Sequence, residues 1–238
     1  IGGFMVDLPP SHFRGWEPFT KHYFDDLNKK WATDKKYKEL GDCFEKILRD
    51  VFQGHDLSSA PIKKNPRRSR GGTYLYKRFV RIHPKGFHQN GIQIFIECFS
   101  GGTQMDAYKR DPSDASYNDL GFPIPDDSMG IFIGMSAISH FLNGEEWGME
   151  DCAKNIDTAR EFFYELEERM EDARAWALGF TGSGDDFKIV QDSRVQRIRI
   201  KLPYLSLDSD DWEDCKINEG LKGLASVFGD LFAEYSSQ

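Results

Sequence analysis

Two segments of the chain alternate between apolar and polar residues, and this pattern limits the possible folds more than any other feature. In the segment 195–202, three aliphatic residues alternate with three cations: Ile198, Ile200 and Leu202 against Arg197, Arg199 and Lys201. In the segment 91–99, Ile92, Ile94 and Ile96 alternate with Gln93, Phe95 and Glu97. A period of two places successive side chains on opposite faces of a strand. Because like charges on one face repel, we expect the three cations to face water or a polyanion rather than the core.

The neighbouring segments predict antiparallel hairpins. We predict two pairs of strands, 73–82 with 91–99 and 187–191 with 195–202. A fifth segment, 130–135, is predicted to form a short buried strand. Asn90-Gly91 suits the turn of the first hairpin, and Asp192-Ser193 separates the strands of the second. Hairpins place sequential strands side by side, so the sheet should be mostly antiparallel.

Apolar residues at three- and four-residue spacing predict four amphipathic helices, over 16–31, 35–52, 150–178 and 218–235. Gly179, Gly182 and Gly184 are expected to end the third helix in a turn, and Ser136 is a candidate N-cap for a brief helix over 136–142. We therefore predict an α+β fold, with a mostly antiparallel sheet built from hairpins and helices packed on one of its faces.

We interpret residues 1–238 as a single α+β domain. It begins with an N-terminal helical pair at about 16–52 and contains a polar loop excursion at about 101–129, which is rich in Asp and Pro. The segment 55–72 is polar and rich in Ser, Pro and Arg, so it predicts an exposed loop.

Charge is distributed unevenly along the chain. Between Asp56 and Glu97 there is no acidic residue, whereas nine basic residues lie there: Lys63, Lys64, Arg67, Arg68, Arg70, Lys77, Arg78, Arg81 and Lys85. The net charge of the chain is −8, so the remainder carries −17 once these nine are set aside. A local positive potential attracts polyanions even on an acidic molecule. Alternatively, the basic segment docks against acidic parts of the same chain.

These observations favour a nucleic-acid-binding domain without a catalytic centre, which uses a basic sheet face and the basic loop 63–70. Cations neutralise phosphates, and aromatic rings stack on bases. The candidate contact residues are Lys63, Lys64, Arg67, Arg68, Arg70, Tyr74, Tyr76, Lys77, Arg78, Phe79, Arg81, Lys85, Arg197, Arg199 and Lys201. Two alternatives stay open: a protein-interaction or regulatory module that acts through the Glu-rich face of the 150–178 helix, and a metal-dependent enzyme that uses the Asp-rich 106–127 loop.

No motif predicts a catalytic residue, a cofactor or a resident metal. A carboxylate nuclease core needs Glu-x-Lys on a strand, but Glu97 is followed by Cys98-Phe99, so the lysine is missing. The oxygen-rich candidates for metal chemistry are Glu97, Asp106, Asp126 and Asp127. The glycines of GFTGSGDDF lack dinucleotide-binding spacing and follow a helix, so they predict a turn.

The chain also lacks the features of a membrane or secreted protein. No apolar run reaches the roughly 18 residues that a membrane-spanning helix needs, so we expect no membrane partner. The four cysteines are widely spaced, which is typical of reduced thiols. We therefore expect an intracellular protein, cytoplasmic rather than nuclear.

Overall fold

The structure, a computed structural model, describes residues 41–55, 62–68, 75–84, 92–100, 122, 125, 128–138, 156–191, 195–206 and 215–237. For residues 63–68, 75–79, 99, 100, 138, 156–160, 236 and 237 it describes the backbone alone. Its strands are β1 (Ile62–Arg68), β2 (Leu75–Ile82), β3 (Ile92–Ser100), β4 (Ser128–Ile138), β5 (Phe187–Gln191), β6 (Val195–Lys201) and β7 (Leu205–Ser206). Its helices are α3 (Ile156–Thr181) and α4 (Ile217–Ser237), together with the helical residues 41–52 and the 3₁₀ turns η1 (Gln53–His55) and η4 (Gly184–Asp186).

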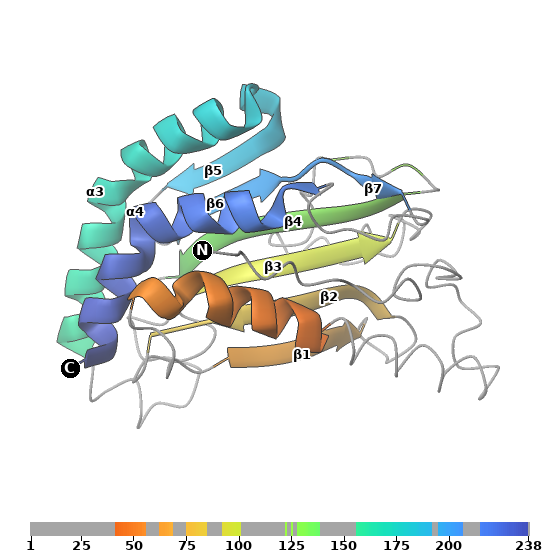
Figure 1. The fold of residues 1–238 in the computed structure, drawn as a ribbon. Helices are drawn as coiled ribbons and strands as arrows, with labels where there is room; N and C mark the ends of the chain where they lie inside the picture. Colours follow the sequence, from red (N-terminus) through yellow and green to blue (C-terminus); the bar gives the residue numbers. More distant parts are fainter. Residues whose placement is uncertain are drawn as a thin grey trace.

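The strands form one sheet in the order β1-β2-β3-β4-β6-β5, and β7 pairs with β4 beside β6 (Figure 1). Every described pair is antiparallel, including the two predicted hairpins β2–β3 and β5–β6. β4 lies at the centre and is longer than the predicted 130–135 segment, because it runs on to Ile138.

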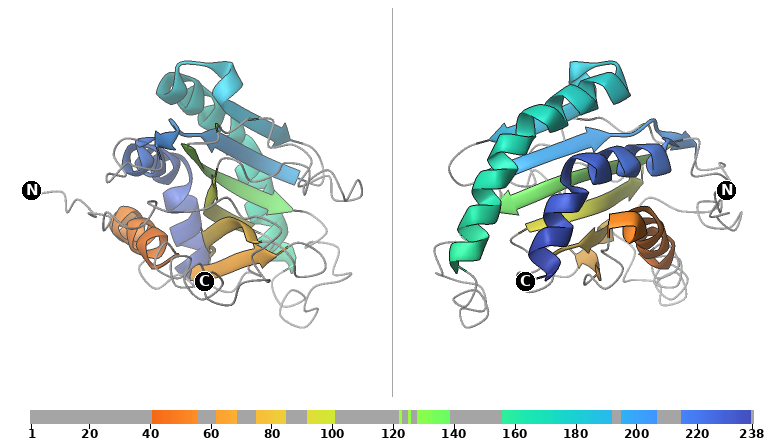
Figure 2. Two further views of the ribbon diagram at one scale, coloured as in Figure 1. Left: turned by 90° about the vertical axis from the view of Figure 1, so that its right-hand side faces the viewer. Right: turned by 60° about the vertical axis from the view of Figure 1, so that its left-hand side comes forward.

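The described helices pack on one face of the sheet, as predicted (Figure 2). Apolar residues of β2, β3, β4 and β6 form one hydrophobic cluster with the helices, as Ile94, Ile133 and Ile198 illustrate. Helix α3 lies over β5 and β6, and α4 lies over β4. Burying this apolar surface stabilises the fold by roughly 25 cal/mol per Å². The mostly antiparallel α+β prediction is therefore confirmed.

The two long helices contact each other through aromatic residues. Phe162 of α3 lies edge-on to Phe232 and Tyr235 of α4, with ring centroids 5.4 and 4.8 Å apart. The Tyr235 hydroxyl donates a hydrogen bond of 2.8 Å to Glu165 Oε1. Edge-to-face contacts of this kind add about 0.5–1.5 kcal/mol each beyond area burial. They fix α4 against α3 above the sheet.

The predicted exposed loop over 55–72 is wrong in its central part, because Ile62–Arg68 form the edge strand β1. The segment's charge and Pro66 are typical of loops, but both are also tolerated on an edge strand, where one side of the backbone has no ladder partner. The flexible loop assigned to Lys63–Arg70 is therefore a strand as far as Arg68, and Arg70 lies outside the described residues.

Two local predictions are also corrected. Ser136 does not cap a helix, because it lies within β4 and pairs with Gln93 and Arg197. Helix α3 does not end at Gly179 but continues to Thr181, and Gly182 follows with φ +72°. The Gly182 amide donates to the Leu178 carbonyl at 2.9 Å, so the left-handed glycine closes the last turn. The predicted 16–31 helix and most of the 101–129 excursion lie outside the described residues.

Gly134 at the centre of β4 should not tolerate a side chain. A Cβ there would meet the Ile198 carbonyl oxygen and lie 2.8 Å from the Phe95 ring. We expect Gly134→Ala to lower the free energy of unfolding by about 1–3 kcal/mol, because overpacking forces neighbours to move. Urea denaturation measures this change.

Gly179→Ala is the matched control for this substitution. Gly179 lies in α3 and a Cβ there would meet nothing within 4 Å. It should raise the free energy of unfolding by about 0.5–1 kcal/mol, because alanine favours the helix. Equal stability of Gly134→Ala and the unaltered protein would contradict the close approach of β6 and Phe95 to β4.

Candidate anion-binding face of the sheet

The sheet has a second face, opposite the helices, on which the register gathers most of the strand cations. Directly opposed residues in antiparallel strands share a face. The register therefore places on this second face the positions Lys63, Asn65 and Arg67 of β1, Lys77, Phe79 and Arg81 of β2, Gln93, Phe95 and Glu97 of β3, Phe132, Gly134 and Ser136 of β4, Arg197, Arg199 and Lys201 of β6, and Lys188 and Val190 of β5. Cations distant in sequence thus occupy one face.

The remaining predicted contact residues are placed differently. Lys64 pairs with Val80 and Arg78 pairs with Cys98, so both positions fall on the helix side. Tyr76 lies at the shift in the β1–β2 register and has no register partner there. Arg68 pairs with Leu75 at a shift in the register. Arg70, Tyr74 and Lys85 lie outside the described residues.

The middle of the second face is buried, which corrects the expectation that the β6 cations face water. Arg199 Nη2 lies 3.1 Å from Glu97 Oε2, and their side chains are only 11% and 2% exposed. Phe95 and Phe132 are buried beside them. A carboxylate with so little exposure needs a charged or hydrogen-bonding partner, and Arg199 is that partner. The pair gives Arg199 a counterion, so this cation does not need water or a polyanion.

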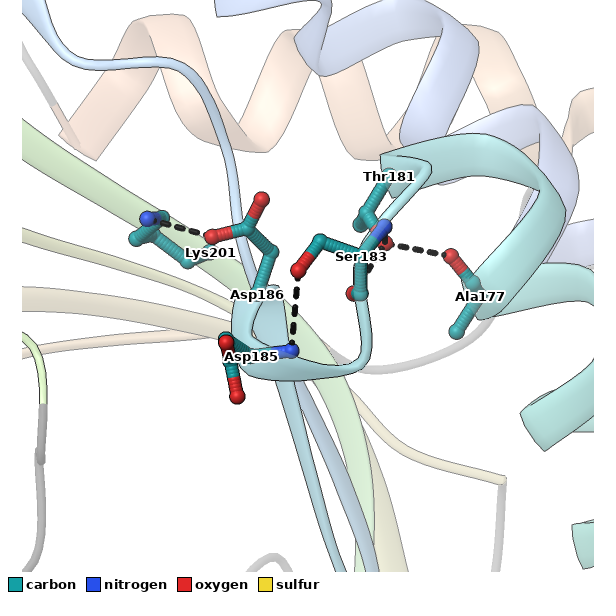
Figure 3. Close-up of polar contacts among 6 residues, drawn as sticks. All are labelled: Ala177, Thr181, Ser183, Asp185, Asp186 and Lys201. Carbon is teal, nitrogen blue, oxygen red and sulfur yellow. Dashed lines mark hydrogen bonds and ion pairs between the residues drawn. The ribbon is translucent and has the colours of Figure 1, made fainter.

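Lys201 also has a carboxylate partner, which the turn after α3 positions. Its Nζ forms an ion pair with Asp186 Oδ1. Figure 3 shows the turn: Ser183 Oγ accepts from the Asp185 amide at 3.2 Å, and Thr181 Oγ1 donates to the Ala177 carbonyl at 2.8 Å. GFTGSGDDF thus contains the turn between α3 and β5, as predicted. This turn places Asp186 beside Lys201 of β6.

An aromatic cluster borders the same end of the second face. Phe122 stacks on Phe132 with ring centroids 5.6 Å apart. Lys188 Nζ and Lys201 Nζ lie 5.4 and 5.6 Å from the centre of the Phe122 ring. Cations over aromatic rings at this distance gain about 0.5–1 kcal/mol at exposed sites. The cluster fixes the lysines rather than presenting a free aromatic surface.

Arg197 differs from its two neighbours on β6, because its partner is neutral. Its Nε donates to Ser136 Oγ at 3.2 Å. Burial, and then the nearby Arg199 charge, lower the pKa of Arg197, while Glu97 acts in the opposite direction. Across the sheet, Arg81 Nη1 donates to Gln93 Oε1 at 3.2 Å.

From the sequence, we expect the candidate metal ligands to be surface carboxylates and the cysteines to be buried. None of their His, Cys, Asp and Glu side chains form a group of three that could hold a metal ion. Of the four candidate metal ligands only Glu97 is described, and its carboxylate contacts Arg199. Burial raises the pKa of the Cys98 thiol, so the thiolate needed for nucleophilic attack is disfavoured. Cys43, Cys98 and Cys215 are not joined by disulfide bonds.

Comparison with protein-family models, curated proteins and solved structures finds no match for this chain. In the part of the chain that the structure describes, no helix is both long and apolar enough to cross a bilayer. The site must therefore be interpreted from its own geometry.

Sequence reasoning missed the carboxylate partners of β6. One signal was present for Glu97, because it is a lone charge in the otherwise uncharged strand IQIFIECFS. A charge that a strand buries must be paired, so a basic residue on a neighbouring strand could have been sought. Nothing in the sequence pattern pointed to Asp186, because its position depends on the shape of the turn.

The buried ion pair predicts a specific mutational result. Glu97→Gln should lower the free energy of unfolding by about 3–5 kcal/mol, because it leaves the Arg199 charge buried without a carboxylate. The double variant Glu97→Gln, Arg199→Met should recover much of this loss, since it removes both charges. Urea denaturation of Glu97→Gln, of Arg199→Met and of the double variant gives the coupling energy between the two side chains. Additive effects of the two substitutions would show that the pair is not coupled.

Proposed function

We propose that the protein binds nucleic acid through the β1–β2 ribbon, formed by Ile62–Arg68 and Leu75–Ile82 at the edge of the sheet. One observation carries this proposal: these adjacent antiparallel strands hold four and three basic residues and no acidic one. The cations are Lys63, Lys64, Arg67 and Arg68 in β1, and Lys77, Arg78 and Arg81 in β2.

Of these cations, Lys63, Arg67 and Lys77 hold positions on one face of the two paired strands, where they could neutralise phosphates together. Lys and Arg side chains that neutralise phosphates release condensed counterions, which drives association. A two-stranded antiparallel ribbon also fits the major groove of duplex DNA. β1 ends the described strand order, so no further described strand pairs with its outer edge. The edge position supports access for an extended polyanion.

The cations of β6 are not part of this proposal. Arg199 contacts Glu97, and Lys201 contacts Asp186, so both have intramolecular counterions. The polyanion contact is assigned to the ribbon cations other than Arg81, which is only 7% exposed and donates to Gln93. Phe79 is the stacking candidate of the ribbon, because its position falls on the same face as Arg67 and Lys77.

A salt series with a matched charge reversal tests the proposal. Arg67 and Lys77 are register partners on one face of the ribbon. We expect affinity for labelled single- or double-stranded DNA or RNA to fall steeply from about 50 to about 300 mM salt. In Arg67→Glu, Lys77→Glu, the slope of log affinity against log salt should decrease by about two, because two phosphate contacts are lost. Fluorescence anisotropy measures both quantities.

The control carries the same charge change away from the ribbon. Lys46 and Lys222 are exposed on the helix side, so Lys46→Glu, Lys222→Glu should change the slope much less. Salt-independent affinity, or equal losses in the two double variants, would refute the ribbon as the contact.

A second candidate is a protein-interaction module that uses the exposed side of α3. Tyr164 is 63% exposed there, and the exposed acidic residues around it are Glu161, Glu167, Glu168, Glu171 and Asp172. Exposed aromatic residues are favoured as anchors in protein interfaces. In quantitative pulldowns, the unaltered protein should retain a basic protein partner after nuclease treatment. The double variant Tyr164→Ala, Glu171→Lys should lose that partner. Retention of that partner by the variant would exclude α3.

A further inference from the structure

We propose that Arg197 and Arg199, with Ser136 and Gln93, form a binding site for a phosphate-type oxyanion on the second face of the sheet. The site lies across β3, β4 and β6, where Gln93 pairs with Ser136 and Ser136 pairs with Arg197. It is distinct from the β1–β2 ribbon and does not depend on the function proposed for it.

The first argument is a local excess of positive charge. Arg197 and Arg199 are two residues apart on one strand, so their Cα atoms lie about 7 Å apart. Among the described residues, the carboxylate that acts on Arg197 is Glu97, and it forms its ion pair with Arg199. Arg197 is left with the neutral Ser136 hydroxyl as its partner. A largely buried guanidinium without a counterion is unfavourable, so an anion beside Arg197 would be stabilising.

The second argument is a surplus of hydrogen-bond donors. Arg199 Nε is buried and has no hydrogen-bond partner among the described residues. Ser136 Oγ accepts from Arg197, which leaves its own proton to donate. Gln93 accepts from Arg81 through Oε1, so its amide nitrogen is turned away from Arg81 and is also left to donate.

The chemistry of these donors selects the ligand class. Planar guanidinium groups recognise phosphate and carboxylate oxygens in a fork geometry. A tetrahedral oxyanion has enough oxygens to accept from two arginines, a hydroxyl and an amide together. The lowered pKa of Arg197, caused by burial and by Arg199, agrees with a positive potential that an anion would relieve. The phosphate group can come from a free phosphate or from a nucleic-acid backbone.

Arg197→Gln tests the site, because it removes a cation that has no carboxylate partner. We expect inorganic phosphate to bind the unaltered protein in titration calorimetry and to raise its unfolding midpoint relative to chloride at equal ionic strength. In Arg197→Gln the dissociation constant should rise at least about tenfold, because one charge-assisted hydrogen bond is lost. Without phosphate the variant should be at least as stable as the unaltered protein in urea.

Two further variants complete the design. Lys222→Gln removes an exposed charge from α4 and should leave phosphate binding unchanged. Arg197→Lys keeps the charge but not the fork, so its affinity should lie between those of the unaltered protein and Arg197→Gln.

Measuring DNA binding by the same variants identifies the source of the phosphate. Weaker DNA binding by Arg197→Gln, together with weaker phosphate binding, would assign the site to a backbone phosphate. Unchanged DNA binding with weaker phosphate binding would assign it to a free phosphate. The proposal is overturned if phosphate acts no differently from chloride, if Arg197→Gln binds phosphate normally, or if that variant is destabilised in phosphate-free buffer. Failure of the ribbon variants to alter DNA binding would bear on the ribbon alone.

Discussion

A continuous antiparallel register across β1, β2, β3, β4, β6 and β5 decides which side chains of this protein meet. Backbone hydrogen bonds fix that register, and a shift of one residue would move every apolar side chain to the opposite face. With the register in place, Ile94, Ile133 and Ile198 face the helices while Phe95, Gly134 and Arg199 face away. The hydrophobic core and the gathering of cations therefore have the same origin.

Gly134 connects the packing of the second face to its electrostatics. The absent side chain leaves room for the Phe95 ring from β3 and for the close approach of β6. Arg199, the register partner of Gly134, reaches across β4 to Glu97 on β3. An ion pair buried this deeply contributes little net stability compared with apolar packing, but losing one partner is costly. The pair allows Arg199 to be buried beside Phe95 and Phe132.

The sequence predicted the elements whose periodicity is undisturbed. The alternation in 195–202 and 91–99 predicted β6 and β3, and the apolar spacing in 218–235 predicted α4 within two residues at each end. β1 was missed because Pro66 and four cations obscure any alternation, although an edge strand accepts both. The buried middle of the second face was missed because the charges of β6 were considered without Glu97, which lies about a hundred residues away in the chain, and without Asp186, which lies in the turn before β5. Whether those charges are exposed depends on such tertiary partners, and strand periodicity contains no information about them.

The charges on the second face fall into two regions with different surroundings. On β6, Arg199 and Lys201 each have a carboxylate, whereas the second-face positions of β1 and β2 include Lys63, Arg67, Lys77 and Arg81 and no acid. Between the regions lie Phe95 and Phe132, which are buried, and Phe122 stacks on Phe132. With neighbouring strands about 4.8 Å apart, β2 and β6 are separated by three steps, or roughly 14 Å. The β3 and β4 positions between them carry no cation and include the buried carboxylate Glu97, so a phosphate backbone crossing there would lose hydration without gaining a cationic partner. If both proposed anion contacts exist, the distance between the ribbon and Arg197 means that each should act independently of the other.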